Sequence, residues 1–438
     1  MPAQGETYRM PTDPLPPPPL PAHSPRPADA PVALDGIRVV DFSHFLAGPL
    51  ATMLLGDLGA EVIKIEKPDG GDDFRTFRPR VGPDDDVSAA FMWANRNKRS
   101  IALDLKRPQG RQVALDLAVT ADVVVENFSA GVMASLGLDY ATLATLNPRL
   151  VYCAVSAYGR SGPDADRLGF DPIVQAETGF MSLTGHPDGE PTRSGPAIMD
   201  MSTGMMACNA VLGALMARHR HGLGQYLEVS LFDTATLMLG FHAANYLVTG
   251  VPHRRTGNTS SDAAPVGVFD AADGPLYLAV ANDRIFRRLA TDVLRRPDLA
   301  DDPDFAHASA RVRNRFRLAA QLETVLASAP REYWLDRMRA AGVPAGAVRT
   351  LDEGLGSAEM AGRATLSRIE HPTLGPLPNM APPFRLAGTP VVDPVAAPTV
   401  GQHTAEILAD VLGYGPDQIA ALTQSGAVGP QAPSTIAP

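Results

Sequence analysis

The feature that most constrains the fold is an alternation of short β-branched runs with segments of helical periodicity. Pro49 and Pro108 stand where a helix can begin, since proline suits the first helical turn, and apolar residues then recur at helical spacing. Strands that alternate with helices build a parallel sheet with helices on both faces. The sequence therefore predicts a doubly wound α/β sheet, with strands near 36–42, 61–66, 123–125, 150–155 and 224–230.

A ligand crevice is expected at one edge of this sheet. In doubly wound sheets, ligands bind beyond the carboxyl ends of the strands. Residues 42–48, Lys67, and the pair Asn127 and Phe128 each follow a predicted strand. We expect these residues to surround one crevice.

A candidate reactive group stands in the stretch 195–204, which joins a turn-rich segment to an apolar helical run at 205–218. Asp200 is expected at or next to the N-cap, where a carboxylate accepts unpaired N–H groups of the first turn. The positive helix end favours the ionised form, and spare N–H groups there could bind a developing oxyanion. A carboxylate held in this way can attack an activated acyl group. This stretch alone favours a plain helix cap over a reactive group.

The length of 438 residues predicts more than one domain. Proline-rich and glycine-rich stretches mark the ends of the chain, and a hairpin pattern around Asp273-Gly274 marks a second folded region. We expect a disordered Pro-rich tail at 1–32, a large α/β domain with a linker at 33–254, a small α+β domain at 255–350, a linker returning to the large domain at 351–425, and a flexible C-terminus at 426–438.

Composition and missing motifs exclude several functions. The net charge of −10 argues against nucleic acid, and no apolar run has the length of a membrane span. Cys153 and Cys208 form no metal-ligand pattern, so no metal is expected and a reducing cytoplasm fits. The dinucleotide-binding glycine pattern, the P-loop and the Gly-x-Ser-x-Gly elbow are absent. Dehydrogenase, P-loop and ordinary serine hydrolase chemistry are therefore disfavoured.

Several short stretches occur in a specific order along the chain: Val40-Asp41-Phe42-Ser43, Leu58-Gly59-Ala60-Glu61-Val62-Ile63-Lys64-Ile65-Glu66, Val125-Glu126-Asn127-Phe128, Gly169-Phe170-Asp171, Gly224-Gln225 and Arg255-Thr256-Gly257-Asn258. Together they resemble the class III CoA-transferases, the CaiB/BaiF family, over about residues 34–425. The resemblance implies a Rossmann-like fold and an interlocked homodimer. It also implies coenzyme A thioesters as substrates, with no permanently bound cofactor.

The catalytic aspartate of this family falls on Asp200. The resemblance implies that Asp200 attacks an acyl-CoA donor and passes through a mixed anhydride to an aspartyl-CoA thioester. A carboxylic acid acceptor then leaves as the new acyl-CoA. The positions that contact coenzyme A in the family fall on Phe45, Leu46, Ala47, Lys67, Leu103, Lys106, Asn127, Phe128 and Val132.

The sequence departs from known members at informative positions. Leu46 replaces a glutamine and Ser135 an arginine of formyl-CoA transferases, which puts formate and oxalate in doubt as substrates. A 2-methylacyl-CoA racemase, a related enzyme of the family, is an alternative function. Phe170 replaces the histidine base of those racemases, so one of the two bases of that reaction is missing. Asp171 remains a possible second acid or a structural hydrogen-bonding group. A non-catalytic CoA-binding protein is a further alternative.

The identity of the acids is not encoded in a motif. Arg193, His44 and Arg255 are candidates to pair with the second carboxylate of a dicarboxylic acceptor. Each of these residue types is also common in structural or solvated roles.

Overall fold

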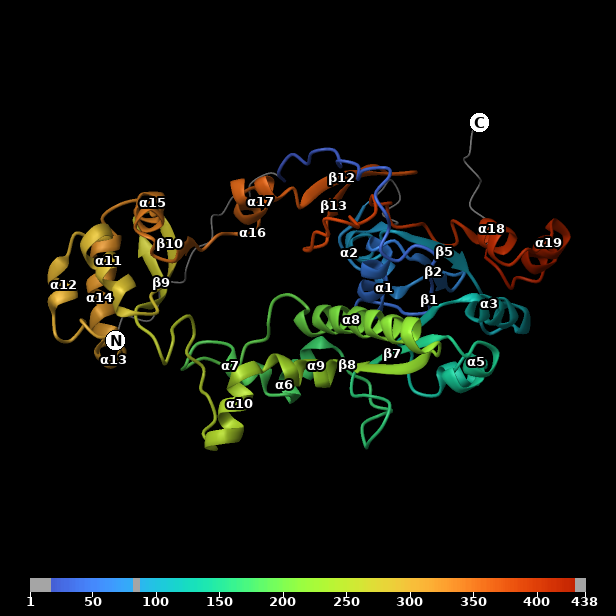
Figure 1. Cartoon of the computed structure of the whole chain (residues 1–438), viewed down its shortest axis with the longest axis horizontal. Helices are drawn as coiled ribbons and strands as arrows, with labels where there is room; N and C mark the ends of the chain where they lie inside the picture. Colours follow the sequence, from blue (N-terminus) through green and yellow to red (C-terminus); the bar gives the residue numbers. More distant parts are fainter. Residues whose placement is uncertain (1–16, 82–86, 430–438) are drawn as a thin grey trace. The chain divides into compact units, whose positions relative to one another are not determined.

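The computed structural model describes residues 17–81 and 87–429 (Figure 1). The chain forms two compact units. The larger comprises the described residues of Pro19–Phe180, Arg193–Gly250 and Ala361–Pro438, and the smaller is built mainly from Met181–Thr192 and Val251–Met360. Residues 1–16 of the predicted N-terminal tail and 430–438 of the predicted C-terminal tail lie outside the described residues.

A six-stranded sheet organises the larger unit, in the order β5-β2-β1-β6-β7-β8 with every neighbouring pair parallel. The strand order reverses between β1 and β6, as in the doubly wound Rossmann arrangement. The predicted fold class is therefore confirmed. The strands are β1 (Arg38–Asp41), β2 (Glu61–Glu66), β5 (Lys98–Ala102), β6 (Val123–Glu126), β7 (Val151–Ser156) and β8 (Gln225–Ser230).

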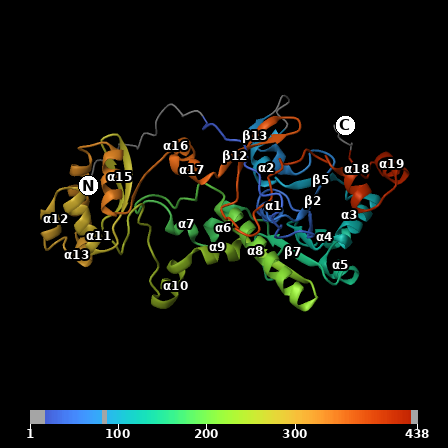
Figure 2. The same cartoon turned by 45° about the horizontal axis from the view of Figure 1, so that its top comes forward.

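Helices cover both faces of this sheet because alternate strand residues point to opposite sides. On one face, Val39 packs in a core with helix α1 (Ala47–Asp57) and helix α8 (Ile198–His221). On the other face, Val40 packs in a core with helix α3 (Pro108–Thr120) and helix α5 (Tyr140–Leu146). Helices α1 and α8 lie side by side in both views (Figures 1 and 2).

Helix α8 is the single helix in the described part of the chain that is long and apolar enough to cross a membrane by length and composition. Of its most apolar window, 44% is buried inside the protein. Its buried positions include Met199, Ala207 and Val211, which pack in the core under the sheet. The apolar character of α8 is therefore used, at least in part, for packing within the larger unit.

Shorter elements complete the larger unit. The segment that begins at residue 17 is tied to it: Ala22 forms a bridge with Arg368, and the Asp393 carboxylate bonds the His23 ring and the Arg26 N–H. The shorter elements of the larger unit are η1 (Asp73–Thr76), β3 (Arg80–Val81), β4 (Val87–Ser88), α2 (Ala89–Ala94), α4 (Val132–Leu136), α6 (Asp171–Glu177), α9 (Leu231–Met238), α10 (Gly240–Thr249), β12 (Leu366–His371), β13 (Gly375–Met380), α18 (Thr404–Glu406), η3 (Ile407–Val411) and α19 (Pro416–Gln424).

The smaller unit is an α+β arrangement, as predicted. Strands β9 (Val266–Ala271), β10 (Gly274–Ala279) and β11 (Ala345–Ala347) form an antiparallel sheet that packs with helices around Leu276, Phe286 and Trp334. The remaining elements are α11 (Asp283–Arg288), η2 (Leu289–Val293), α12 (Pro297–Asp301), α13 (Ala308–Arg313), α14 (Arg315–Leu326), α15 (Arg331–Ala341) and α16 (Leu351–Leu355). Two helices, α7 (Phe180–Leu183) and α17 (Ala358–Arg363), contain a boundary between the units.

Candidate functional site

A larger cavity of about 840 Å³ and a smaller one of about 250 Å³ open where the central strands of the larger unit end. His44 and Phe128 line both, so the cavities adjoin. The larger cavity contains Asp200 and Asp171, and the predicted coenzyme positions are divided between the two cavities. Phe45, Leu46, Ala47, Asn127 and Val132 line the larger cavity, Lys67, Leu103 and Lys106 line the smaller one, and Phe128 lines both.

The loop that follows β1 is fixed by side chains from other strands. His44 N–H donates to Asn127 Oδ1 at 2.9 Å, and Asn127 Nδ2 donates to the His44 carbonyl at 2.8 Å. Phe45 N–H donates to Asp72 Oδ1 at 3.1 Å. These bonds hold Phe45 at a φ of 63°, a left-handed conformation that a non-glycine residue adopts only when its surroundings impose it. The loop therefore presents Phe45 and Leu46 to the cavity in a fixed position.

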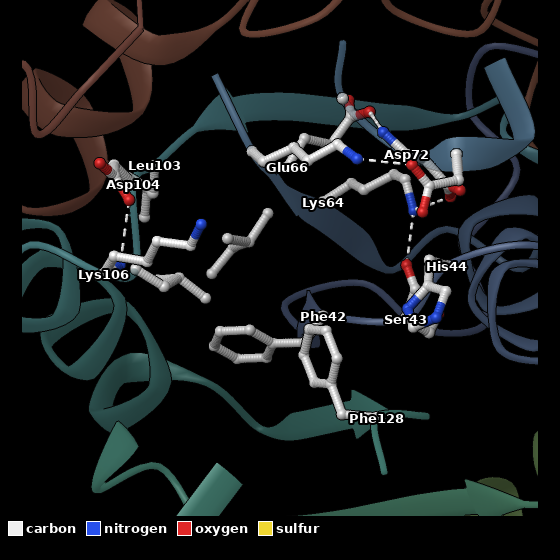
Figure 3. Close-up of a pocket in the computed structure, with 15 residues that line it drawn as sticks. Phe42, Ser43, His44, Lys64, Glu66, Asp72, Leu103, Asp104, Lys106 and Phe128 are labelled. Carbon is white, nitrogen blue, oxygen red and sulfur yellow. Dashed lines mark hydrogen bonds and ion pairs between the residues drawn. The ribbon is translucent and has the colours of Figure 1, made fainter. Parts of the chain in front are cut away.

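Buried ion pairs beneath this loop were not predicted. Lys64 Nζ lies 2.9 Å from Asp72 Oδ2 and donates to the Ser43 carbonyl at 2.7 Å (Figure 3). Lys98 Nζ lies 3.0 Å from Asp41 Oδ2, and both side chains are fully buried. Although burial opposes its charged form, the Lys98 and Lys64 ammonium groups keep the pKa of Asp41 well below its ordinary value. The sequence signal was Lys64 within the apolar run that forms β2, whereas Lys98 begins the polar strand β5 and gave no such signal.

The smaller cavity brings the predicted basic residues to one rim. Lys67 Nζ pairs with the Asp73 carboxylate, and both side chains are more than half exposed. Figure 3 shows Lys106 and Leu103 across the cavity from Lys64. Leu103 is 1% exposed and bridges to Val428, so it is primarily a core residue whose edge reaches the cavity. Lys67 and Lys106 thus place two ammonium groups on the lining of the smaller cavity, alongside the carboxylates of Asp73 and Asp104.

Asp200 does not cap helix α8, which corrects the prediction from sequence. It is the third residue of the helix, whose N-cap position, Ala197, has no side-chain cap. Asp171 Oδ2 instead accepts Met199 N–H at 2.6 Å and Asp200 N–H at 3.2 Å. The N–H groups expected to be spare for an oxyanion are therefore occupied by Asp171, whose structural role is clear.

The Asp200 carboxylate receives no hydrogen bond from the described part of the chain. Burial, with a smaller contribution from the nearby Asp171 charge, raises the pKa of Asp200 to about 7 from its ordinary 3.8. A carboxylate with a pKa near neutrality is far more basic than one in water, and its ionised form lacks the solvation that normally blunts it as a nucleophile. Asp200 is therefore a carboxylate of raised pKa that lines the larger cavity.

Phe170 forms an apolar wall where a racemase would need a base. It is 63% exposed, lines the larger cavity and meets the Phe45 ring edge-on at a centroid distance of 6.3 Å. The imidazole of His44 is the one histidine ring on the described lining of this cavity, and burial lowers its pKa below the ordinary 6.5. In the residues that the structure describes, no cluster of three His, Cys, Asp or Glu side chains could hold a metal ion.

The fold and site define an α/β protein that receives a ligand at the switch point of a doubly wound sheet, beside a carboxylate of raised pKa. Comparison with known proteins gives the family: residues 34–404 match CoA-transferase family III, and the chain belongs to that family. It is therefore a family III CoA-transferase, as the sequence motifs indicated.

Relatives of known name agree. The succinate–glutarate CoA-transferase of Agrobacterium fabrum is 38% identical over 382 residues, covering 86% of this chain and 95% of that protein. The acetyl-CoA:oxalate CoA-transferase of Acetobacter aceti is 41% identical over 333 residues, covering 76% and 85%. The crystal structure of a CaiB/BaiF family protein from Brucella suis superposes with a TM-score of 0.79 at 37% identity, covering 87% of this chain and 99% of that one.

Proposed function

We propose that this enzyme moves coenzyme A between an acyl-CoA thioester and a free dicarboxylic acid, with Asp200 as the nucleophile. The observation that carries the proposal is that Asp200, with a pKa of about 7, lines the same cavity as most of the predicted coenzyme positions. Lys67 and Lys106 line the adjoining cavity, where their ammonium groups are suited to pair with phosphates of the coenzyme.

The reaction then proceeds through Asp200 in balanced steps. An Asp200 carboxylate oxygen attacks the donor thioester carbonyl, and the C–S bond breaks to give a mixed anhydride and the CoA thiolate. The thiolate attacks the aspartyl carbonyl of the anhydride, releasing the donor acid and leaving an aspartyl-CoA thioester. The acceptor carboxylate attacks this thioester and releases the thiolate. The thiolate then attacks the acceptor carbonyl, which forms the new acyl-CoA and restores the Asp200 carboxylate.

The oxyanions of these steps need stabilising partners other than the first turn of α8, since Asp171 occupies the N–H groups there. Helix α1 begins at Ala47 on the cavity wall, and its N-cap residue Leu46 makes no side-chain cap. The N-terminus of a helix carries about half a positive charge. We assign oxyanion stabilisation to this end of α1, whose position is set by the fixed loop after β1.

Dicarboxylic acids are the proposed substrates because the relatives described above carry the names of succinate, glutarate and oxalate. The racemase alternative has no support at Phe170, whose phenyl ring cannot carry a proton. A non-catalytic CoA-binding protein would not require the raised pKa of Asp200.

A covalent adduct tests the nucleophile. Incubation with succinyl-CoA and no acceptor is expected to add coenzyme A to the peptide that contains Asp200, detected by intact mass and peptide mapping. Asp200→Asn is expected to give no adduct, whereas Asp164→Asn, which changes an exposed carboxylate of the same unit, is expected to give the wild-type amount. Turnover without an adduct, together with full activity of Asp200→Asn, would refute the proposal.

We also propose that the chain acts as a homodimer. Helices α9 and α10 expose large apolar side chains on the described surface, and Leu237, Phe241, Leu247 and Val248 are each between 66% and 87% exposed. Contiguous exposed apolar surface typically marks a protein interface. A monomer mass by analytical ultracentrifugation at micromolar concentration would contradict this proposal.

A further inference from the structure

The larger cavity contains a cation that the proposed chemistry of Asp200 does not use. Among the described residues that line it, Arg193 is the one lysine or arginine, and most of the lining is apolar. The other two candidates from the sequence differ. Burial lowers the pKa of His44, which disfavours its charged form, and Arg255 is absent from the described lining of this cavity.

The charge of Arg193 is not neutralised within the described part of the chain. Its Nη1 donates to the carbonyls of Ser194 and Gly195, each at 3.1 Å, and no carboxylate pairs with it. Arg160 provides a contrast, because its guanidinium lies 2.9 Å from Glu126 and is thereby committed to a structural ion pair. Arg193 therefore retains a full positive charge and free N–H donors for an anionic ligand.

The loop that carries Arg193 is tied to the helix that carries Asp200. Ser194 N–H donates to Gln175 Oε1 at 2.9 Å, and Gln175 Nε2 donates to Asp171, the carboxylate that holds the first turn of α8. The same hydrogen-bonded chain thus fixes both the cation and the nucleophile. This arrangement suits a ligand that must reach both at once.

We propose that Arg193 determines acceptor specificity by binding the distal carboxylate of a dicarboxylic acid while the other carboxylate reacts at Asp200. This inference rests on the proposed function. A dianion entering an apolar cavity that contains Asp171 and Asp200 is repelled and loses solvation, unless a cation pairs with it. A guanidinium is well matched to a carboxylate because it donates two parallel hydrogen bonds.

The experiment compares two acceptors of equal chain length, glutarate and valerate, which differ by one carboxylate. Arg193→Gln is expected to lower kcat/KM for glutarate relative to that for valerate by about 10- to 100-fold, chiefly through KM, as expected for losing a charged hydrogen bond. Arg193→Lys keeps the positive charge but loses the paired N–H donors of the guanidinium. Its ratio of kcat/KM for glutarate to kcat/KM for valerate is expected to lie between the ratios of the wild type and Arg193→Gln. Arg220→Gln, which removes an exposed arginine at the far end of α8, is the matched control and is expected to keep the wild-type ratio.

The outcomes separate this inference from the proposed function. An equal fall for both acceptors, a wild-type protein that prefers valerate, or a rise confined to the KM of the CoA donor would overturn the role of Arg193. The aspartyl-CoA adduct is measured in every variant. If the adduct forms normally and the ratio does not change, only the specificity inference fails. If the wild-type protein forms no adduct, both the proposed function and the specificity inference fail.

Discussion

Asp171 and Asp200 line the same cavity and both lie in the first turn of a helix, yet their surroundings are opposite. Asp171 receives hydrogen bonds from the Met199 and Asp200 N–H groups and from Gln175. The Asp200 carboxylate receives none from the described residues and is buried beside the Asp171 charge. Hydrogen-bond supply, more than position on a helix, therefore separates the structural carboxylate of Asp171 from the carboxylate of Asp200, whose pKa is raised.

The comparison also explains why the two acids occur together. Asp171 fixes the start of α8 by satisfying the N–H groups that Asp200 would otherwise cap. Deprived of those donors, Asp200 keeps a raised pKa, to which the Asp171 charge contributes. Asp171 thus positions the backbone of Asp200 and, together with the larger effect of burial, raises its pKa.

The largest expected effect is the loss of transfer activity when the Asp200 carboxylate is removed. Asp200→Asn removes the nucleophile while keeping the shape of the side chain, so we expect transfer to fall by at least about a thousandfold. Steady-state transfer from succinyl-CoA to glutarate measures it. Loss of less than tenfold, with the variant folded by circular dichroism, would show that Asp200 is not the nucleophile.

The next largest expected effect is a loss of stability when the Asp171 carboxylate is removed. Asp171→Ala leaves two buried N–H groups at the start of α8 without partners, and we expect the free energy of unfolding to fall by about 2–4 kcal/mol. Urea denaturation measures the change. Asp164→Ala, at an exposed position, serves as the control. Equal stability of Asp171→Ala and wild type would mean that α8 does not depend on this cap.

The smallest effect is a gain in stability, opposite in sign to the loss expected for Asp171→Ala. Because the folded pKa of Asp200 is about 7 and its ordinary value is 3.8, ionising this group costs stability as pH rises from about 4 to 7. Asp200→Asn is therefore expected to be more stable than wild type by about 1–3 kcal/mol at pH 8 and equally stable below pH 4. Urea titrations at both pH values measure it. A variant less stable than wild type at pH 8 would contradict the raised pKa.

The same ionisation sets the pH dependence of transfer. Only the charged Asp200 attacks the thioester, so kcat/KM is expected to fall about tenfold per unit below pH 7 and to level off above it. A profile flat between pH 5 and 8 would assign the limiting step to another group.

Much of the sheet was predictable because its strands are local apolar runs. The run Val123-Val124-Val125 became β6, and the residues after it, Asn127 and Phe128, reached the expected crevice. Strand β5 was missed because its sequence, Lys-Arg-Ser-Ile-Ala, is polar. Its buried Lys98 pairs with Asp41 and also donates hydrogen bonds to the Pro49 carbonyl and to Asn95 Oδ1. Such a strand depends on partners that are distant in sequence.

The sequence by itself determined the parallel sheet, the crevice at its carboxyl edge and a carboxylate at the start of α8, because periodicity and turn residues are local properties. Only the tertiary structure decided that Asp171 caps this helix and that Asp200 does not, since the two residues meet when α6 packs on α8. It also decided that Lys64 and Asp72 fix the loop after β1. Charge and hydrogen-bond partners come from segments far apart in the chain, and the pKa of Asp200 follows from where those segments meet.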